Sequence, residues 1–258
     1  MTGSGAAPAI SSLRHPIIVA AARLGAGRER KRTGLTLLEG PVLTGEAAAA
    51  GLGFERLFAL EGDETARRIA DASGCPLILV TPDVLAKVST TRQAQSPVAV
   101  LAVPADNARP GRRSLVAWGV GDPGNCGTLI RTAAAFGHDY LAGPGAAETW
   151  APKVLRSAAG GHFRTGVGRV ATLDELRRGR TLVATVPRGG SEPGLLPAGA
   201  AILIGSEPHG LPSEVVDACA ISVTIPMAAG SESINAAVAG AIVAFLGGWE
   251  PGANLTPP

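Results

Sequence analysis

Short apolar runs alternate with Ala-rich segments along almost the whole chain, and this alternation limits the folds open to it. A strand covered on both faces reads as a continuous apolar run, and parallel strands need a helical crossover between them. The pattern therefore predicts an α/β protein with a mainly parallel sheet and covering helices. We expect strands at residues 35–39, 56–60, 77–81, 98–103, 115–120, 140–142, 182–186, 201–204 and 221–225.

A turn-rich, basic stretch at residues 105–113 interrupts this alternation and has no periodicity, as expected of a linker. The chain has 258 residues, which suits two modest domains, and its 46% hydrophobic content supports buried cores. The sequence therefore predicts a first domain at 1–104 and a second at 114–258.

Charge by itself does not identify a partner, because the net charge is only +2. Its distribution says more: a short N-terminal stretch carries Arg28, Arg30, Lys31 and Arg32 against the single acid Glu29. Such a cluster suits the phosphates of RNA, and the alternative is a solvated helix end.

Cysteine and histidine usage argues against metal and nucleophile chemistry. The three cysteines are too few and too scattered for a disulfide framework or a zinc site, and the four histidines lack metal-ligand spacing. We therefore expect no metal and a reducing, cytoplasmic setting. No export signal is apparent, and the apolar segment 234–249 is shorter than the ~20 residues of a spanning helix, so we expect a buried helix and no membrane partner.

The stretch from Asn125 to Gly137 predicts a helix with Asn125 as its N-cap and Gly137 as its stop. Arg131 is the only charge between Cys126 and Phe136, so we expect its guanidinium at or beneath the rim of a packed surface. It presents five donors suited to a phosphate or a carboxylate. The alternative is a structural Arg paired with an internal carboxylate.

Three glycine-bearing turns follow expected strands of the second half, at residues 119–125, 205–211 and 225–235. Ligands of open parallel sheets bind at such carboxyl ends. The first turn partly fits a dinucleotide fingerprint, but no acidic residue follows the next strand, which argues against a dehydrogenase.

Taken together, these turns resemble the three signature motifs of the TrmH-type SPOUT RNA 2′-O-methyltransferases. The resemblance rests on Asn125, Gly127 and Arg131, then Gly205, Glu207, Gly210 and Leu211, then Ile225, Pro226, Met227, Ser233 and Asn235. The segment with Pro152, Lys153, Arg156, Ser157 and Gly160 is similar to the family's region between the first two motifs. The first half more loosely resembles an RNA-binding domain of ribosomal-protein L30e type.

The resemblance implies a deep trefoil knot in the second domain, which general topology rules would not suggest. It also implies a homodimer in which each site borrows groups from the partner. It places S-adenosylmethionine beside Gly205, Ile225, Met227 and Ile234, and it places RNA contacts at Lys153 and Arg156. Pro208 departs from the commoner pattern, in which many members have glycine.

The implied reaction is methyl transfer from S-adenosylmethionine to a ribose 2′-hydroxyl, which needs a proton acceptor or stabilisation of a developing oxyanion. A guanidinium has a pKa above ~12 and is a poor base, so we expect Arg131 to clamp a phosphate and stabilise the 2′-oxygen, with the proton acceptor left open. We expect Asn125, Ser233 and Asn235 to orient the ribose and Arg131, and Glu207 to hold Arg131 or a loop backbone.

The expected substrate is 23S ribosomal RNA, because the first half resembles the domain of rRNA-directed members. Two alternatives within the fold are a tRNA 2′-O-methyltransferase and a catalytically silent RNA-binding protein. A small-molecule methyltransferase is disfavoured by the accessory domain and the Arg-rich stretch.

Overall fold

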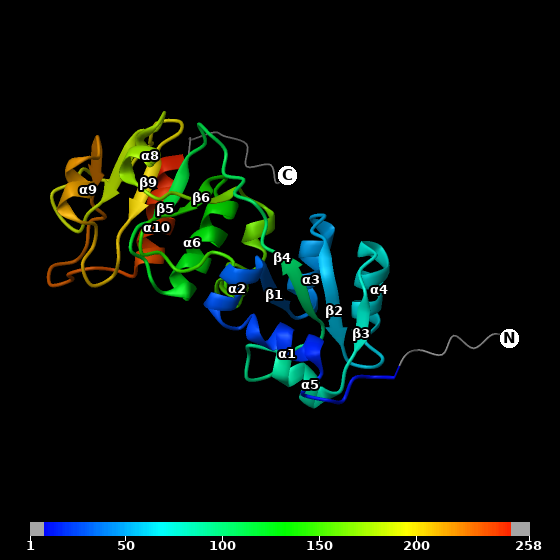
Figure 1. The fold of residues 1–258 in the computed structure, drawn as a ribbon. Helices are drawn as coiled ribbons and strands as arrows, with labels where there is room; N and C mark the ends of the chain where they lie inside the picture. The colour runs from blue at the N-terminus through cyan, green and yellow to red at the C-terminus, as the bar shows by residue number, and fades with distance from the viewer. Residues whose placement is uncertain (1–7, 249–258) are drawn as a thin grey trace. The chain divides into compact units, whose positions relative to one another are not determined.

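The computed structural model describes residues 8–248, and the chain divides into two compact units (Figure 1). The first unit contains the residues up to Pro104 together with Trp150–Arg156. The second contains Ala105–Thr149 and the residues from Ser157 onwards.

The first unit is built on a four-stranded sheet of order β1-β4-β2-β3. Only β2 and β3 pair in parallel, whereas β4 runs antiparallel to both β1 and β2. This sheet is therefore mixed, unlike the mainly parallel arrangement expected along the whole chain. Its strands are β1 (Leu35–Glu39), β2 (Phe54–Ala59), β3 (Leu77–Leu79) and β4 (Val98–Ala102).

Five helices accompany this sheet, namely α1 (Pro16–Arg23), α2 (Gly27–Thr33), α3 (Pro41–Ala49), α4 (Glu64–Ser73) and α5 (Pro82–Val88). One face of the sheet packs on α1 and α5 through a buried apolar cluster that includes Ile18, Leu37, Phe58, Leu85 and Val100. The short apolar runs of the sequence were sufficient to place these strands. Whether two strands pair in parallel or antiparallel depends on the path of the segment that connects them, which the local sequence does not encode.

The second unit contains a six-stranded sheet of order β10-β8-β9-β5-β6-β7, in which every pairing is parallel. The strands are β5 (Ser114–Ala117), β6 (Asp139–Ala142), β7 (Val167–Arg169), β8 (Leu182–Thr185), β9 (Ala201–Ile204) and β10 (Ile221–Val223). Sequence analysis missed β7, because this edge strand is short and carries Gly168 between Val167 and Arg169.

The other elements after residue 104 are α6 (Pro123–Ala135), α7 (Pro152–Ala158), the 3₁₀ turn η1 (Gly161–Phe163), α8 (Leu173–Arg177), α9 (Ser213–Asp217) and α10 (Ala236–Gly248). Most of α7 belongs to the first unit. The segment 234–249 forms the helix α10 at Ala236–Gly248, and Trp249 lies outside the described residues. The helix is buried on one face only, because Val238 and Phe245 are exposed. No helix among residues 8–248 is long and apolar enough to cross a bilayer.

The strand order brings separate loops to one edge of this sheet. Ala117 pairs with Ile204, and Thr185 pairs with Val223, so β5, β9, β8 and β10 end close together. The turns that the sequence singled out leave these ends, and the strand order therefore gathers them into one region.

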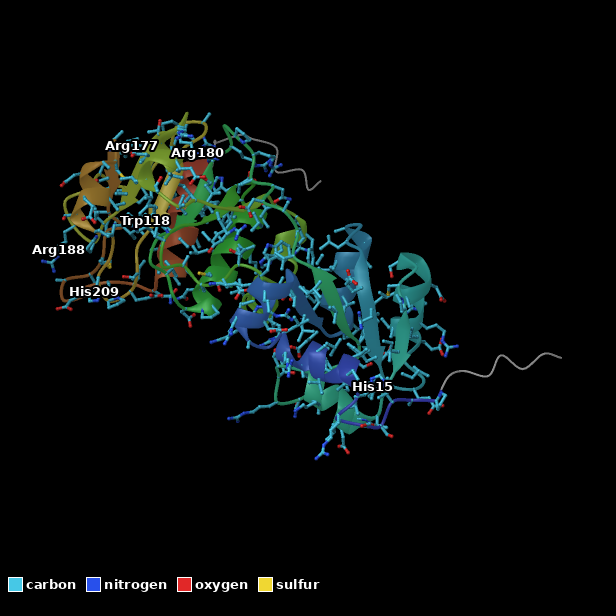
Figure 2. All side chains as sticks on the ribbon, in the orientation of Figure 1. His15, Trp118, Arg177, Arg180, Arg188 and His209 are labelled. Atoms are coloured by element: carbon cyan, nitrogen blue, oxygen red, sulfur yellow. The ribbon has the colours of Figure 1, made fainter. Side chains whose placement is uncertain are left out.

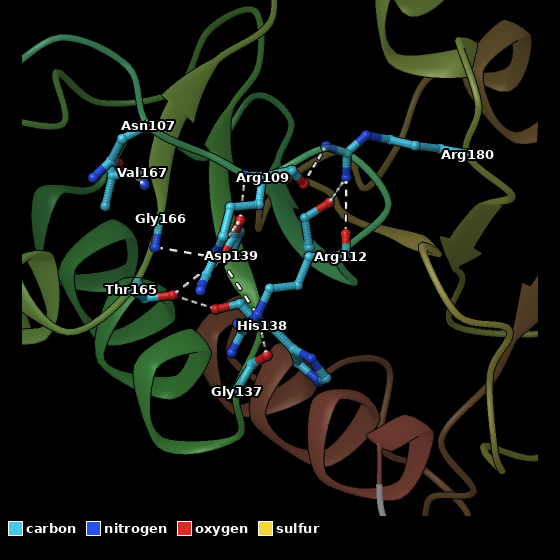
Figure 3. Close-up of polar contacts among 11 residues, drawn as sticks. Asn107, Arg109, Arg112, Gly137, His138, Asp139, Thr165, Gly166, Val167 and Arg180 are labelled. Carbon is cyan, nitrogen blue, oxygen red and sulfur yellow. Dashed lines mark hydrogen bonds and ion pairs between the residues drawn. The ribbon is translucent and has the colours of Figure 1, made fainter. Parts of the chain in front are cut away.

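Residues 105–113 do not form a free linker, because they are bonded along the β6–β7 side of the second unit (Figure 3). Asn107 exchanges two hydrogen bonds with Val167, and the buried carboxylate of Asp139 accepts from the Arg109 side chain and backbone amide. Burial alone would raise the pKa of Asp139, but these hydrogen bonds outweigh it and hold the pKa below its usual value. Asn107 and Arg109 thus hold this segment to the second unit by hydrogen bonds.

Helix α6 begins differently from the prediction. Its N-cap is Asp122, whose carboxylate accepts the backbone N–H of Asn125 at 2.9 Å, and Pro123 occupies the first helical position. Asn125 therefore lies in the first turn, where its side-chain amide is not used for capping. Gly137 ends the helix region in the left-handed conformation, with a φ of 68°.

Candidate active site

A cavity of about 590 Å³ opens at the carboxyl ends of β8, β9 and β10. Its walls include the apolar side chains of Ile204, Val223, Ile225 and Ile234. Polar groups lie at a few points, including the carboxylates of Glu207 and Glu232 and the hydroxyls of Ser206 and Ser233. Small-molecule sites usually combine a volume of ~300–1,000 Å³, apolar walls and a few polar groups in this way.

The turn after β9 is closed on itself. Ser206 and Gly210 exchange two backbone hydrogen bonds of 3.2 and 2.8 Å. Gly205 lies so close to this closure that an added Cβ would be 2.3 Å from the carbonyl carbon of Gly210. Only glycine fits there, and the turn presents Glu207 at its tip.

Three polar side chains from distant parts of the sequence join beside the cavity. Asn125 on α6 donates its side-chain N–H to Glu207, and its side-chain oxygen accepts from Asn235 at 3.0 Å. Asn235 in turn caps α10, because its side-chain oxygen accepts the backbone N–H groups of Ala237 and Val238 at 2.9 and 3.2 Å. The three predicted motifs are thus connected by one hydrogen-bonded chain.

The residues expected around the cofactor lie together. Gly205, Ile225, Met227 and Ile234 all line the cavity, as do Glu207 and Ser233 from the expected catalytic group. Asn125 and Asn235 do not line it themselves and reach it through Glu207.

Arg131 lies elsewhere on α6 and does not line the cavity. It is exposed, whereas its neighbours Ile130 and Thr132 are buried, so the predicted position at or beneath the rim of a packed surface was wrong. Among residues 8–248 its guanidinium has no hydrogen bond or ion pair, which argues against the alternative of an internal carboxylate partner. The backbone of Arg131 packs closely against Gly161, where an added Cβ would lie 3.0 Å from the Arg131 Cα.

The basic stretch around α2 separates into two kinds of residue. Arg28, Lys31 and Arg32 are exposed, and Arg32 pairs with Glu29. Arg30 is buried and donates to the backbone carbonyls of Leu24 and Gly25 at 2.7 and 2.9 Å. Its assignment to the RNA surface is therefore corrected, because the guanidinium holds the end of α1 in place.

Lys153 and Arg156, the two cations expected to contact RNA from the intermotif segment, both lie on α7. Lys153 is exposed, whereas Arg156 is half-buried and donates to Glu39 at 3.1 Å and to Thr90 at 2.8 Å. The Arg156 guanidinium is therefore already hydrogen-bonded within the first unit.

Sequence analysis missed part of the cavity wall. Thr185 lines it from the end of β8, Val186 and Pro187 line it from the loop that follows, and His209 lines it from the turn after β9. Arg188 follows the first of these loops, and Figure 2 shows both Arg188 and His209 on the loops that leave the strand ends. The signal was available in the strand prediction, since every parallel strand of this sheet ends at the same edge.

Cys126 is fully buried and directs its thiol to the carbonyl oxygen of Val120 at 3.1 Å. Burial raises the pKa of Cys126, so the thiol stays protonated at neutral pH. The expectation that Cys126 is a packing residue fits this environment. Within residues 8–248 no three His, Cys, Asp or Glu side chains are grouped as they would be around a metal ion.

Sequence comparison identifies two family regions in the chain. Residues 112–245 match the SpoU rRNA Methylase family, and residues 15–99 match the MRM3-like substrate binding domain. The chain is 32% identical over 231 residues to the Bacillus subtilis 23S rRNA (guanosine(2553)-2'-O)-methyltransferase RlmP, with 86% of this chain and 92% of that protein covered. It is also 32% identical to an uncharacterized tRNA/rRNA methyltransferase of Synechocystis, with 96% of both covered.

Solved structures show the same fold. The SpoU methyltransferase AviRb from Streptomyces viridochromogenes, in complex with its cofactor AdoMet, superimposes with a TM-score of 0.82 and 27% identity. The match covers 91% of this chain and 97% of that chain. It therefore extends over both units rather than over the parallel sheet alone.

Proposed function

The chain belongs to the SpoU rRNA methylase family, and from this we propose that it transfers the methyl group of S-adenosylmethionine to a ribose 2′-hydroxyl of 23S ribosomal RNA. The observation that carries the proposal is the hydrogen-bonded chain of Glu207, Asn125 and Asn235 at the edge of the cavity. It joins all three motif loops at one place. We also propose a cytoplasmic location, which the similarity to the Bacillus subtilis methyltransferase supports.

The cavity fits S-adenosylmethionine in its chemistry. Ile204, Ile225 and Ile234 offer apolar walls to an adenine ring, and Gly205 and Gly210 line the same cavity with backbone groups. The carboxylate of Glu207 or Glu232 is suited to a cationic sulfonium. When bound, the cofactor supplies an activated methyl group.

The residues of the chain must then position and polarise the acceptor. We assign Arg131 to a phosphate next to the reacting ribose and to the developing charge on the 2′-oxygen. Its guanidinium is exposed and has no hydrogen bond or ion pair with the described residues, so it can make these contacts. Asn125 and Asn235 hold the loops through neutral hydrogen bonds, and Ser233 offers a hydroxyl to the ribose.

We propose that two copies of the chain associate through the exposed apolar face formed by Phe136, Val238 and Phe245. These side chains are 41%, 49% and 42% exposed, and the rings of Phe136 and Phe245 lie 5.6 Å apart. Arg131 lies on α6, the helix that ends beside Phe136. We propose that a second copy covering this apolar face brings Arg131 near the partner's loops.

We further propose that the first unit binds the RNA. It matches a substrate binding domain, and it exposes Arg28, Lys31 and Arg32 along α2 and Lys153 on α7. Phosphate contacts of such cations supply affinity without reading sequence.

Replacement of Arg131 tests the proposed reaction. We expect Arg131→Ala to reduce tritium transfer from labelled S-adenosylmethionine to unmodified 23S rRNA by more than tenfold, which corresponds to more than ~1.4 kcal/mol of transition-state stabilisation. Cofactor affinity measured by calorimetry should change little, because Arg131 is outside the cavity.

The matched control is Arg67→Ala, which removes an exposed cation from α4 in the other unit. Its methyl transfer should equal that of the unaltered protein. Activity of Arg131→Ala within tenfold of normal would remove Arg131 from the reaction.

A further inference from the structure

The segment between α5 and β4, residues 89–97, contains both glutamines of the chain, Gln93 and Gln95 (Figure 1). We call it the glutamine loop. It surrounds a second hollow of about 420 Å³, lined by Glu39, Thr91, Arg92, Gln93, Gln95 and Arg156. All of these residues belong to the first unit.

The first half of the loop is held by the carboxylate of Glu39, which lies at the end of β1 and is only 7% exposed. Glu39 accepts from the hydroxyls of Ser89, Thr90 and Thr91 and from the backbone N–H of Thr90 at 3.0 Å. Burial alone would raise its pKa, but these hydrogen bonds and the charge of Arg156 lower it, so the carboxylate stays ionised. Its charge is already compensated and does not repel an anion strongly.

The second half of the loop is also anchored. The hydroxyl of Ser96 donates to Asp63 at 2.6 Å and accepts the backbone N–H of Leu60 at 3.1 Å. Gln95 lies over Gly40, where an added Cβ would be 2.6 Å from the glutamine Oε1. The loop backbone is therefore ordered before any ligand arrives.

The side chains that this ordered loop presents are not used by the protein. Arg92, Gln93 and Gln95 are exposed, and within residues 8–248 their side chains make no hydrogen bond or ion pair. Two primary amides, each with donors and an acceptor, thus lie beside a free guanidinium and a second arginine, Arg156.

We propose that this hollow binds one unpaired nucleotide of the RNA substrate, an inference that rests on the proposed function. Amide side chains pair with the hydrogen-bonding edge of a base, and arginine binds phosphate in a two-pronged geometry. A base within a duplex has its edge already paired, whereas sequence-specific readers of RNA bind unpaired bases. Gln93 and Gln95 therefore read the base, and Arg92 holds the adjoining phosphate.

The test compares Gln93→Ala/Gln95→Ala with Arg92→Ala in the full-length protein. We expect the double variant to raise KM for a 23S rRNA transcript at least tenfold while kcat and cofactor affinity stay within twofold. Its affinity for the transcript, measured by filter binding, should fall equally at all salt concentrations because no charge is lost. Arg92→Ala should instead reduce the slope of log affinity against log salt by about one.

Two further measurements separate this inference from the proposed function. Arg67→Ala is the control for Arg92→Ala, and it should change neither KM nor affinity. A photo-crosslinking residue at Gln93 should label an unpaired nucleotide. Normal KM and affinity of the double variant, or labelling confined to duplex RNA, would overturn the inference, even if the unaltered protein methylates RNA. Absence of methyl transfer by the unaltered protein would overturn the proposed function alone, since filter binding and crosslinking still test the hollow.

Discussion

The sequence pattern assigns both the helix cap and a site contact to Asn125, but in the structure Asp122 takes the first of these roles. Asp122 accepts the backbone N–H of Asn125 and caps α6, and this leaves the Asn125 amide free to contact Glu207 and Asn235. Because Pro123 has no N–H and prefers the first helical position, the cap falls one residue before it. Because the cap lies three residues before Asn125, the Asn125 side chain is available for the site role that the sequence predicts.

His162 provides a test of electrostatics at the residue scale. It is 4% exposed, and its Nε2 lies 2.9 Å from the carbonyl oxygen of Thr149. Burial lowers its pKa from 6.5 to about 4, against the smaller opposing effect of that hydrogen bond. Between these two values the unfolded chain binds more protons than the folded one, so stability is retained above pH 6.5 and is lost as the pH falls toward 4.

We predict that this one group lowers the free energy of unfolding by about 2 kcal/mol between pH 7.5 and pH 5. Urea unfolding at the two pH values measures the difference, which should shrink by that amount in His162→Phe. His138 is also buried and its pKa is also lowered, so part of the pH dependence remains in the variant. His209→Gln, at an exposed position, is the control and should keep the full difference. If the pH difference in the free energy of unfolding were unchanged in His162→Phe, burial would not be lowering the pKa of His162.

At the scale of elements, backbone contacts rather than side chains fix the conformation of the turn after β9. Gly205 has no room for a Cβ because the backbone of Gly210 and Leu211 folds over it. Pro208 is tolerated between them because the bonds that close the turn come from Ser206 and Gly210. The departure from the commoner family pattern at Pro208 therefore leaves the closure intact.

We predict that Gly205→Ala destabilises the protein by about 1–3 kcal/mol, since the added methyl group must displace backbone. It should also weaken S-adenosylmethionine binding at least tenfold, because the displaced turn forms part of the cavity wall. Gly194→Ala is the matched control, since an added Cβ there has no atom within 4 Å. Urea unfolding and calorimetry measure both effects, and normal cofactor affinity in folded Gly205→Ala would place the cofactor elsewhere.

For the whole molecule, the separation of Arg131 from the cavity has a consequence for assembly. If Arg131 serves the cavity of the other copy in a homodimer, two inactive variants should complement each other. One subunit with Arg131→Ala still offers an intact cavity, and one with Glu207→Ala still offers Arg131.

We predict that co-expression of these two variants in equal amounts restores about a quarter of normal methyl transfer, because half of randomly formed dimers are mixed and one of their two sites is complete. Each variant alone serves as the control and should stay inactive. No recovery in mixed dimers, verified by two affinity tags, would show that Arg131 serves its own subunit's cavity.

Much of the fold was readable from local pattern, because a buried strand is a short apolar run and a parallel sheet gathers its loops at one edge. The strand at 35–39 was predicted with its observed bounds, and the expected cofactor residues Gly205, Ile225, Met227 and Ile234 all line one cavity. The trefoil knot and the homodimer stay predictions.

The sequence by itself determined most of the strands, the site-bearing loops and the family, since these depend on residue type, spacing and period. Only the tertiary structure decided what each polar side chain contacts. It buried Arg30 against backbone carbonyls, exposed Arg131, and anchored the linker through Asp139. It also gathered the glutamine loop around Glu39. These outcomes depend on groups brought together by folding, and a hydrogen bond between residues distant in sequence leaves no periodic signal in the chain.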